Sequence, residues 1–194
     1  NYSLAARLML GKSVGDRPQK FFLGGNSQMM IFSDTQTEGR DDSGFYAQRV
    51  LDYDNTSILE DVYFSEYVFP LRGARYRERV GENVAVANFE FRFPFVHYVD
   101  VSFPARIRFG NIFGHLFVDV GAAWDSSDEF NNSELVRNKY GLTDPEASPI
   151  LTTFGIGTKI FTPFALIRID TAWDKYPSGG YSKPQYIISF GYDW

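Results

Sequence analysis

The chain has 194 residues, a formal net charge of -5 at pH 7 and no cysteine. The negative charge argues against nucleic acid as a partner, because a phosphate-binding surface needs clustered Lys and Arg. Without cysteine there is neither a disulfide framework nor a thiolate metal site. No apolar run approaches the ~20 residues of a membrane helix, yet aromatic residues make up 18% of the chain beside 17 glycines. This composition is typical of membrane β-barrels, in which only alternate residues face lipid.

Apolar and polar residues alternate along most of the chain, with the period of two that indicates β-strands. We predict about six strands, each near the ~9–11 residues that cross a bilayer as a tilted strand. The chain begins at Asn1, so we expect that further N-terminal strands precede it. In chain order, the alternating segments are residues 4–10, 85–95, 116–124, 154–160, 167–173 and 186–194.

The connections between these segments fall into two classes. Residues 13–83, 125–150 and 174–184 are long and polar, whereas 161–164 is very short and 97–111 is intermediate. Because successive strands run up and down, the long connections lie together on one side, as in outer-membrane barrels. We therefore interpret residues 1–194 as part of one transmembrane antiparallel β-barrel domain, with a long external or lumenal loop at 13–83. A soluble all-β domain would also alternate, with its apolar face turned inward.

Several short motifs follow one another along the chain. In order, they are Phe21-Phe22-Leu23-Gly24-Gly25, Pro70-Leu71-Arg72-Gly73-Ala74, Asn88-Phe89-Glu90-Phe91-Arg92-Phe93-Pro94, Phe117-Val118-Asp119-Val120-Gly121-Ala122-Ala123-Trp124, Phe154-Gly155-Ile156-Gly157, Ile167-Arg168-Ile169-Asp170-Thr171-Ala172-Trp173 and Phe190-Gly191-Tyr192-Asp193-Trp194. In this order and spacing, the chain resembles the C-terminal barrel half of the BamA/TamA-type proteins, also called the bacterial surface antigen family. The resemblance covers most of the chain except an insertion at about 26–66. Phe-Pro-Leu-Arg-Gly after a long insertion is most similar to members with an upstream TolB-like propeller.

The resemblance implies a sixteen-stranded outer-membrane barrel whose long loop folds into the lumen and presents an Arg-Gly pair. Arg72 and Gly73 match this pair, but Ala74 stands where Phe or Tyr is usual. Independently, Glu90 and Asp119 lie on the polar faces of neighbouring strands, so both carboxylates could accept planar hydrogen bonds from one guanidinium. The alternative is that these are unrelated solvated charges, which contribute little. The predicted cluster comprises Arg72, Gly73, Glu90, Asp119 and Gly121.

The last strand carries a second set of candidate residues. The resemblance implies that this strand forms one side of a weakly paired seam and that its aromatic end serves as the signal for barrel insertion. A strand edge presents unpaired amides and carbonyls, so it can template a new strand. The residues of this set are Tyr186, Ile188, Phe190, Gly191, Tyr192 and Trp194.

The function that this combination favours is insertion or translocation of unfolded outer-membrane or secreted proteins at the bacterial outer membrane. No covalent chemistry is needed, so we predict no enzyme, no cofactor and no metal site. His97 and His115 fit no metal-ligand spacing and are interpreted as turn or lumen residues. The alternative is a non-catalytic anchor that tethers a soluble domain or partner complex at the surface, which the 26–66 insertion favours because large loops carry interactions. A soluble all-β binding module is a third possibility.

The apolar face formed by Phe89, Phe91, Phe93 and Phe95 generates a first prediction. We expect the chain to enter detergent micelles or lipid and to aggregate in plain buffer, because this face would otherwise meet water. Size-exclusion chromatography with and without detergent measures this. A monodisperse peak in plain buffer would contradict a membrane barrel.

Overall fold

The computed structural model describes residues 2–25, 29–32, 65–74, 78–101, 107–162 and 166–191. It confirms the all-β fold, with two short helices in one connection. Within the described part of the chain, no helix has the length and apolar character needed to cross a membrane. The elements are β1 (Ser3–Lys12), β2 (Lys20–Leu23), β3 (Met29–Phe32), β4 (Ser65–Phe69), β5 (Arg79–Gly81), β6 (Asn83–Val101), β7 (Ile107–Trp124), η1 (Ser127–Phe130), α2 (Ser133–Tyr140), β8 (Ile150–Phe161), β9 (Leu166–Lys175) and β10 (Gln185–Gly191).

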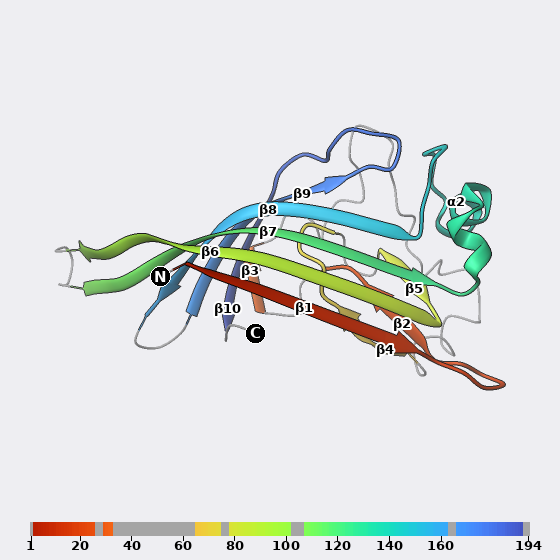
Figure 1. Cartoon of the computed structure of the whole chain (residues 1–194), viewed down its shortest axis with the longest axis horizontal. Helices are drawn as coiled ribbons and strands as arrows, with labels where there is room; N and C mark the ends of the chain where they lie inside the picture. The colour runs from red at the N-terminus through yellow and green to blue at the C-terminus, as the bar shows by residue number, and fades with distance from the viewer. Residues whose placement is uncertain are drawn as a thin grey trace.

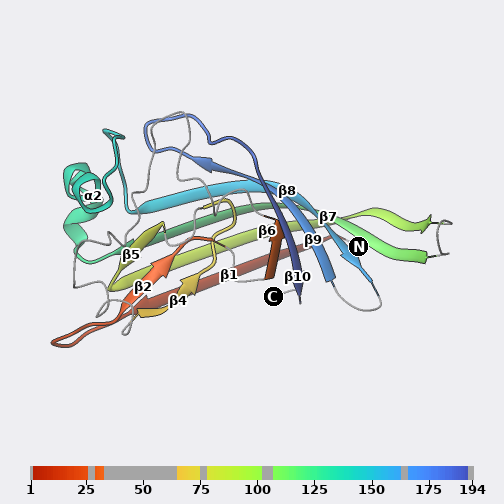
Figure 2. The same cartoon turned by 180° about the vertical axis from the view of Figure 1, so that it is seen from behind.

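Seven strands form one open, curved sheet in the order β1-β6-β7-β8-β9-β10-β3, and three form a small sheet in the order β4-β2-β5. Every pair in the large sheet is antiparallel. Figures 1 and 2 show the small sheet on the concave side of the large one, with α2 at the end where the long connections gather. β8 ends and β9 begins at the opposite end of the sheet, as the alternation of strand directions predicts.

The two faces of the large sheet have opposite character. Apolar side chains on the convex face are exposed, whereas charged side chains on the concave face are buried, which inverts the usual soluble arrangement. A soluble all-β module would turn the apolar face inward, so this arrangement favours lipid on the outside. The exposed set includes Leu4, Leu8, Leu10, Phe89, Phe91, Phe95, Leu116, Val118, Ile156, Ile169 and Tyr186, and the buried set includes Glu90, His115, Asp119, Lys159, Arg168 and Asp170.

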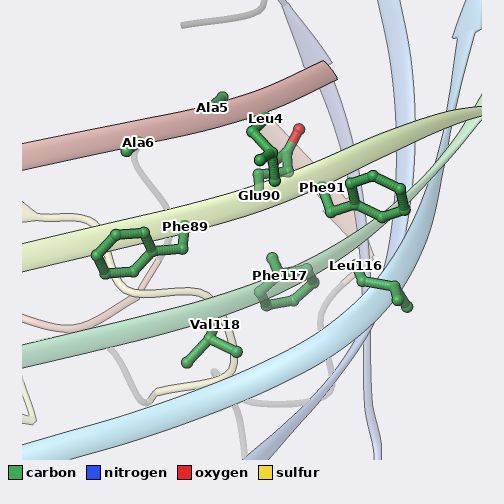
Figure 3. A pocket seen from close by; sticks show the side chains of 9 residues that line it. All are labelled: Leu4, Ala5, Ala6, Phe89, Glu90, Phe91, Leu116, Phe117 and Val118. Carbon is green, nitrogen blue, oxygen red and sulfur yellow. The ribbon is translucent and has the colours of Figure 1, made fainter. Parts of the chain in front are cut away.

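A close view of the convex face shows what lipid would meet. Phe89 and Phe91 on β6 and Leu116 and Val118 on β7 spread around a shallow hollow that Leu4 of β1 also lines (Figure 3). Nearly all of the lining residues are apolar. An open and irregular apolar surface of this kind suits flexible acyl chains.

The small sheet packs on the concave face through a buried apolar cluster. Leu23 of β2 and Leu71, which follows β4, lie over Gly121 of β7, where an added Cβ would come within 3.0 and 3.1 Å of them. Gly121 therefore leaves the space that the side chains of these two leucines occupy. The cluster comprises Phe21, Leu23, Leu71, Ala74, Val84, Val86, Ala123 and Leu151.

Residues 13–83 therefore do not form a plain loop, because they contain β2, β3, β4 and β5. These strands have only three to five residues, too few for a period of two to stand out. β2 also pairs with β4 across more than forty residues of sequence, a contact that local pattern cannot predict. The predicted intermediate connection at 97–111 is likewise too long, since β6 extends to Val101 and β7 begins at Ile107.

The connection at 97–111 was predicted too long because residues that usually end a strand lie inside β6 and β7. Pro94 lacks an N–H, and the register of β6 on β7 shifts between Pro94 and Val96. A second irregularity, between Gly110 and Ile112, lies in the pairing of β7 with β8. Both strands thus continue past residues that ordinarily indicate their ends.

The connection after β7 contains helices that the sequence pattern did not indicate. Ser126 and Glu129 form a capping box at η1, and Gly141 ends α2 in the left-handed conformation at φ 64°. Tyr140 at the end of α2 donates a hydrogen bond to the carbonyl of Val80 in β5, at 2.8 Å. Burial raises the pKa of Tyr140, which keeps the phenol protonated as this donor. The helical connection thereby clamps the small sheet against the large one.

The assignment of faces generates a second prediction. Arg at Val118, in the middle of β7 on the convex face, should cost ~2–4 kcal/mol of folding free energy in lipid. Val14 is the matched control, because it is 77% exposed and lies beyond the end of β1, so Val14→Arg should cost ~0–1 kcal/mol. Urea titration of folding into lipid vesicles measures both. Equal costs at the two positions would show that the convex face does not meet lipid.

Candidate functional site

Arg72 lies in the turn that joins β4 to β5. The N–H of Leu71 donates to the carbonyl of Gly25 at 2.9 Å, and the N–H of Ala74 donates to that of Leu71 at 3.3 Å. Gly73 has φ +83°, a left-handed conformation that glycine adopts at low cost, and a Cβ there would lie 2.7 Å from the Cβ of Ala172. Both the conformation and the close approach require glycine, and together they press the turn against the concave face.

The guanidinium of Arg72 contacts two carboxylates on adjacent strands. Its Nε and Nη2 donate to Oδ2 and Oδ1 of Asp119 at 2.7 and 2.8 Å, and its Nη1 donates to Oε2 of Glu90 at 2.8 Å. All three residues are buried, with relative exposures of 4% for Arg72, 0% for Asp119 and 1% for Glu90. The structure thus brings together the predicted residues on β6, β7 and the loop tip. Their geometry is the planar fork that only arginine presents to two acceptors.

An aromatic ring packs against the face of the same guanidinium. The Cζ of Arg72 lies 3.8 Å from the centroid of the Phe117 ring, within the range of a cation–π contact. Gly155 on β8 leaves room for that ring, because a Cβ there would come within 2.4 Å of it. The family resemblance implies an aromatic directly after the Arg-Gly pair, where this chain has Ala74. Ala74 instead packs in the buried apolar cluster, and the wall of the sheet supplies the ring.

Two further cations complete the cluster, and sequence reasoning did not assign them a role. Oε1 of Glu90 accepts from Nε of Arg92 at 2.6 Å and from Nζ of Lys159 at 2.5 Å. Both side chains stand on the polar faces of predicted strands, which was the available signal. With them, three cations surround two carboxylates, so the desolvation cost of burying each carboxylate is offset by close partners. Hereafter the Arg72 cluster means Arg72, Glu90, Arg92, Phe117, Asp119 and Lys159.

The charge of Arg72 itself is secure in this setting. Burial alone lowers the pKa of Arg72, but the hydrogen bonds and Coulombic attraction of Asp119 and Glu90 outweigh that effect and hold the pKa above its ordinary value. The guanidinium therefore stays charged throughout the pH range in which proteins fold.

A second buried ion group lies beside the cluster on β7, β9 and β10. Nε2 of His115 lies 2.8 Å from Oδ1 of Asp170, and Arg168 lies 3.4 Å from Asp170 and 3.3 Å from Oγ of Ser189. Gly157 makes the approach possible, because a Cβ there would lie 2.1 Å from Asp170. His115 thus faces inward, and Gly155 and Gly157 on β8 both allow side chains of neighbouring strands to approach the backbone closely. Among the described residues, no group of three His, Cys, Asp or Glu could hold a metal ion.

The residues predicted for the last strand lie apart from the Arg72 cluster. Tyr186 is exposed, Ile188 and Phe190 are half-buried, and these three alternate with the inward-facing Ile187 and Ser189. Gly191 pairs with Leu166 of β9. Tyr192 and Trp194 lie outside the described residues. The other edge of β10 pairs with β3, a contact that the sequence did not predict.

An open antiparallel sheet with an apolar convex face and buried ions on its concave face is part of the wall of a β-barrel. A family model described as "Omp85 superfamily domain" matches residues 4–193, and the chain belongs to this superfamily. The match confirms the resemblance to BamA/TamA-type barrels, and members of the superfamily in general insert or translocate proteins at the outer membrane. Searches of curated proteins and of solved structures gave no match.

The geometry of the Arg72 cluster generates a third prediction. Arg72→Ala and Asp119→Ala should each destabilise the docked loop by ~3–5 kcal/mol, because each leaves a buried charge without its main partner. The double variant should cost much less than the sum, since both changes remove one interaction. Arg72→Lys should also fail, because a single ammonium cannot reach both carboxylates in one plane.

Protease sensitivity of the loop and heat-modifiable electrophoretic mobility report the docked state. Arg17, exposed in the same connection, is the matched control, and Arg17→Lys and Arg17→Ala should leave both measurements unchanged. A coupling energy of zero between Arg72 and Asp119 would show that their ion pair does not hold the loop tip on the concave face.

Proposed function

We propose that this chain is the C-terminal part of an outer-membrane barrel that inserts or translocates unfolded outer-membrane or secreted proteins without covalent chemistry. Its partners in this proposal are the lipid bilayer and the unfolded client. The observation that carries the proposal is the Arg72 cluster, which fixes the loop tip to the inner wall. Membership of the Omp85 superfamily supports it.

The Arg72 cluster makes one part of the wall rigid. Arg72 joins β6 and β7, and Gly73 abuts Ala172 on β9. β10 is attached to that wall by its pairing with β9 over Gln185–Gly191. β10 is the last strand in chain order on that wall. A strand held on a rigid sheet presents a fixed row of backbone donors and acceptors, which is what a client strand needs as a template. Insertion by strand pairing requires no nucleophile, acid or base.

The packing of the concave face favours a second candidate function. The small sheet and the helical connection fill that face with buried apolar clusters, which is also what a permanently plugged barrel requires. In this alternative, the barrel anchors a soluble domain or a partner complex at the cell surface. The two functions differ in whether the barrel accelerates folding of a client.

The fourth prediction tests this difference with the full-length protein in lipid vesicles. The probe is a urea-denatured eight-stranded outer-membrane barrel, whose folding is followed by heat-modifiable mobility. Wild type should accelerate folding of the probe, and Arg72→Lys should reduce the rate ~10-fold, equivalent to about 1.4 kcal/mol. Arg17→Lys should leave it unchanged.

A folded wild-type barrel that does not accelerate the probe would contradict the insertion proposal and support the anchor. Protease digestion can show that the loop of the Arg72→Lys variant is undocked. If the probe then still folds at the normal rate, docking of the loop tip is not required for insertion.

A further inference from the structure

The convex face of β1, β6 and β7 holds an apolar depression at the end of the sheet where the long connections gather. Its volume is about 320 Å³, and every residue that lines it is apolar. The floor consists of small side chains, Ala85 and Ala87 on β6 and Ala122 on β7, and Leu8 of β1 lies at one side. Leu8 is 69% exposed and Ala122 only 7%, so the side of the depression stands well above its floor.

A residue of the helical connection forms another side of this depression. Phe130, the last residue of η1, lies on the convex face, where its ring centroid is 5.1 Å from that of Trp124 in an edge-to-face contact. η1 is held by the capping box of Ser126 and Glu129, and Glu129 also accepts from Nζ of Lys139 at 3.1 Å. The depression is therefore enclosed by residues that are themselves fixed in place.

The strand register shows which side chains lie at the rim and which lie below it. At the rim, Lys12 is opposite Asn83, and Asn83 is opposite Trp124. Larger side chains begin at Phe89, which lines the neighbouring hollow in Figure 3. Toward the middle of the sheet, the rows are Leu10, Ala85 and Ala122, then Leu8, Ala87 and Val120, then Ala6, Phe89 and Val118.

The polar groups left free at this rim are hydrogen-bond donors. Lys12 is exposed, and within the described part of the chain neither its ammonium nor the indole N–H of Trp124 has a partner. The acids of the helical connection beside Trp124 are already bound, because Lys139 lies 2.8 Å from Asp125 and 3.1 Å from Glu129. An anionic group with oxygen acceptors therefore complements the rim.

We propose that this depression binds one acyl chain of a membrane lipid whose anionic phosphate headgroup is held by Lys12 and Trp124. The lipid site means the depression together with these two residues. The inference rests on the contact of the convex face with lipid. It is independent of whether the barrel inserts clients or anchors a partner complex.

The two parts of the lipid site contribute differently. An empty depression would forfeit dispersion contacts, so a flexible acyl chain fills it whatever headgroup the lipid carries. This contact does not select among lipids, because the chain leaves one hydrocarbon environment for another. Selection falls to the rim, where phosphate oxygens accept from the ammonium of Lys12 and the indole N–H of Trp124. One cation near anionic headgroups is worth a preference of ~5-fold.

The same end of the sheet offers a matched position without a depression. Lys175, at the end of β9, is also exposed. Beside it, however, the ring of Trp173 is stacked on that of Phe154 with centroids 5.8 Å apart, and Tyr181 packs edge-on against Phe154 at 5.4 Å. Large rings thus occupy the surface on which an acyl chain would lie. Lys175 has the charge of Lys12 without the apolar part of the site.

The fifth prediction tests the headgroup with the full-length protein in vesicles. The vesicles contain equal amounts of phosphatidylglycerol and phosphatidylcholine with the same acyl chains, and native mass spectrometry counts the lipids that stay bound after extraction. Wild type should retain one lipid, with phosphatidylglycerol preferred. Lys12→Gln should lower the ratio of the two bound lipids ~5-fold. Lys175→Gln should leave this ratio unchanged.

A second pair of variants tests the depression. Ala85→Leu fills its floor and should abolish retention of both lipids. Ala6→Leu adds the same bulk on the convex face outside the lipid site, opposite Phe89, and should retain the lipid as wild type does. Heat-modifiable mobility shows that each variant is folded, so a loss of lipid cannot be attributed to unfolding.

Each other outcome would overturn the lipid site. Equal retention of the two lipids by wild type, or an unchanged ratio in Lys12→Gln, would show that the rim does not recognise phosphate. An equal loss in Lys175→Gln would show a general attraction of anionic lipid to the rim of the sheet. Retention by Ala85→Leu would show that the chain lies elsewhere. None of these results bears on the proposed function, which is measured separately by the folding rate of the barrel probe.

Discussion

The arrangement of the molecule depends on one guanidinium held between two buried carboxylates. Arg72 brings a loop tip to the concave face, where Asp119 binds it through two hydrogen bonds and Glu90 through a third. Loss of either partner is costly because the remaining charge is buried without a counterion, where water cannot solvate it. Arg92 and Lys159 stabilise Glu90, and the ring of Phe117 supports the guanidinium. The small sheet packs beside this contact on the concave face, and the helical connection after β7 bonds to the small sheet through Tyr140 and Val80.

The inverted faces of the large sheet explain why such a cluster can exist. A sheet that exposes Phe89, Leu116 and Val118 to lipid has its alternate side chains facing the interior of the barrel. Charged groups can gather there if they satisfy one another, and glycines on β7, β8 and the loop tip leave the space they need. Gly155 and Gly157 show the principle most clearly, since each accommodates a side chain of the neighbouring strand. The alternation of apolar and polar residues along each strand thus accounts both for the buried ion pairs on the concave face and for the exposed apolar side chains on the convex face.

The sequence by itself determined the strands of the large sheet other than β3, and their faces, because a period of two is a local property that each strand repeats. It also placed Glu90 and Asp119 on one side of adjacent strands and singled out Arg72, although only in combination with a family resemblance. Tertiary structure alone decided that Phe117 and Lys159 join them, since Phe117 contacts a residue of the loop and Lys159 reaches Glu90 from two strands away. Arg92 stands two residues from Glu90 on the same face of β6, so its contact is local. The short strands β2 to β5 and the pairing of β3 with β10 depend on partners far apart in the chain. Contacts of that kind leave no periodic trace in a sequence, because their stability comes from burial and pairing that exist only once the sheet has formed.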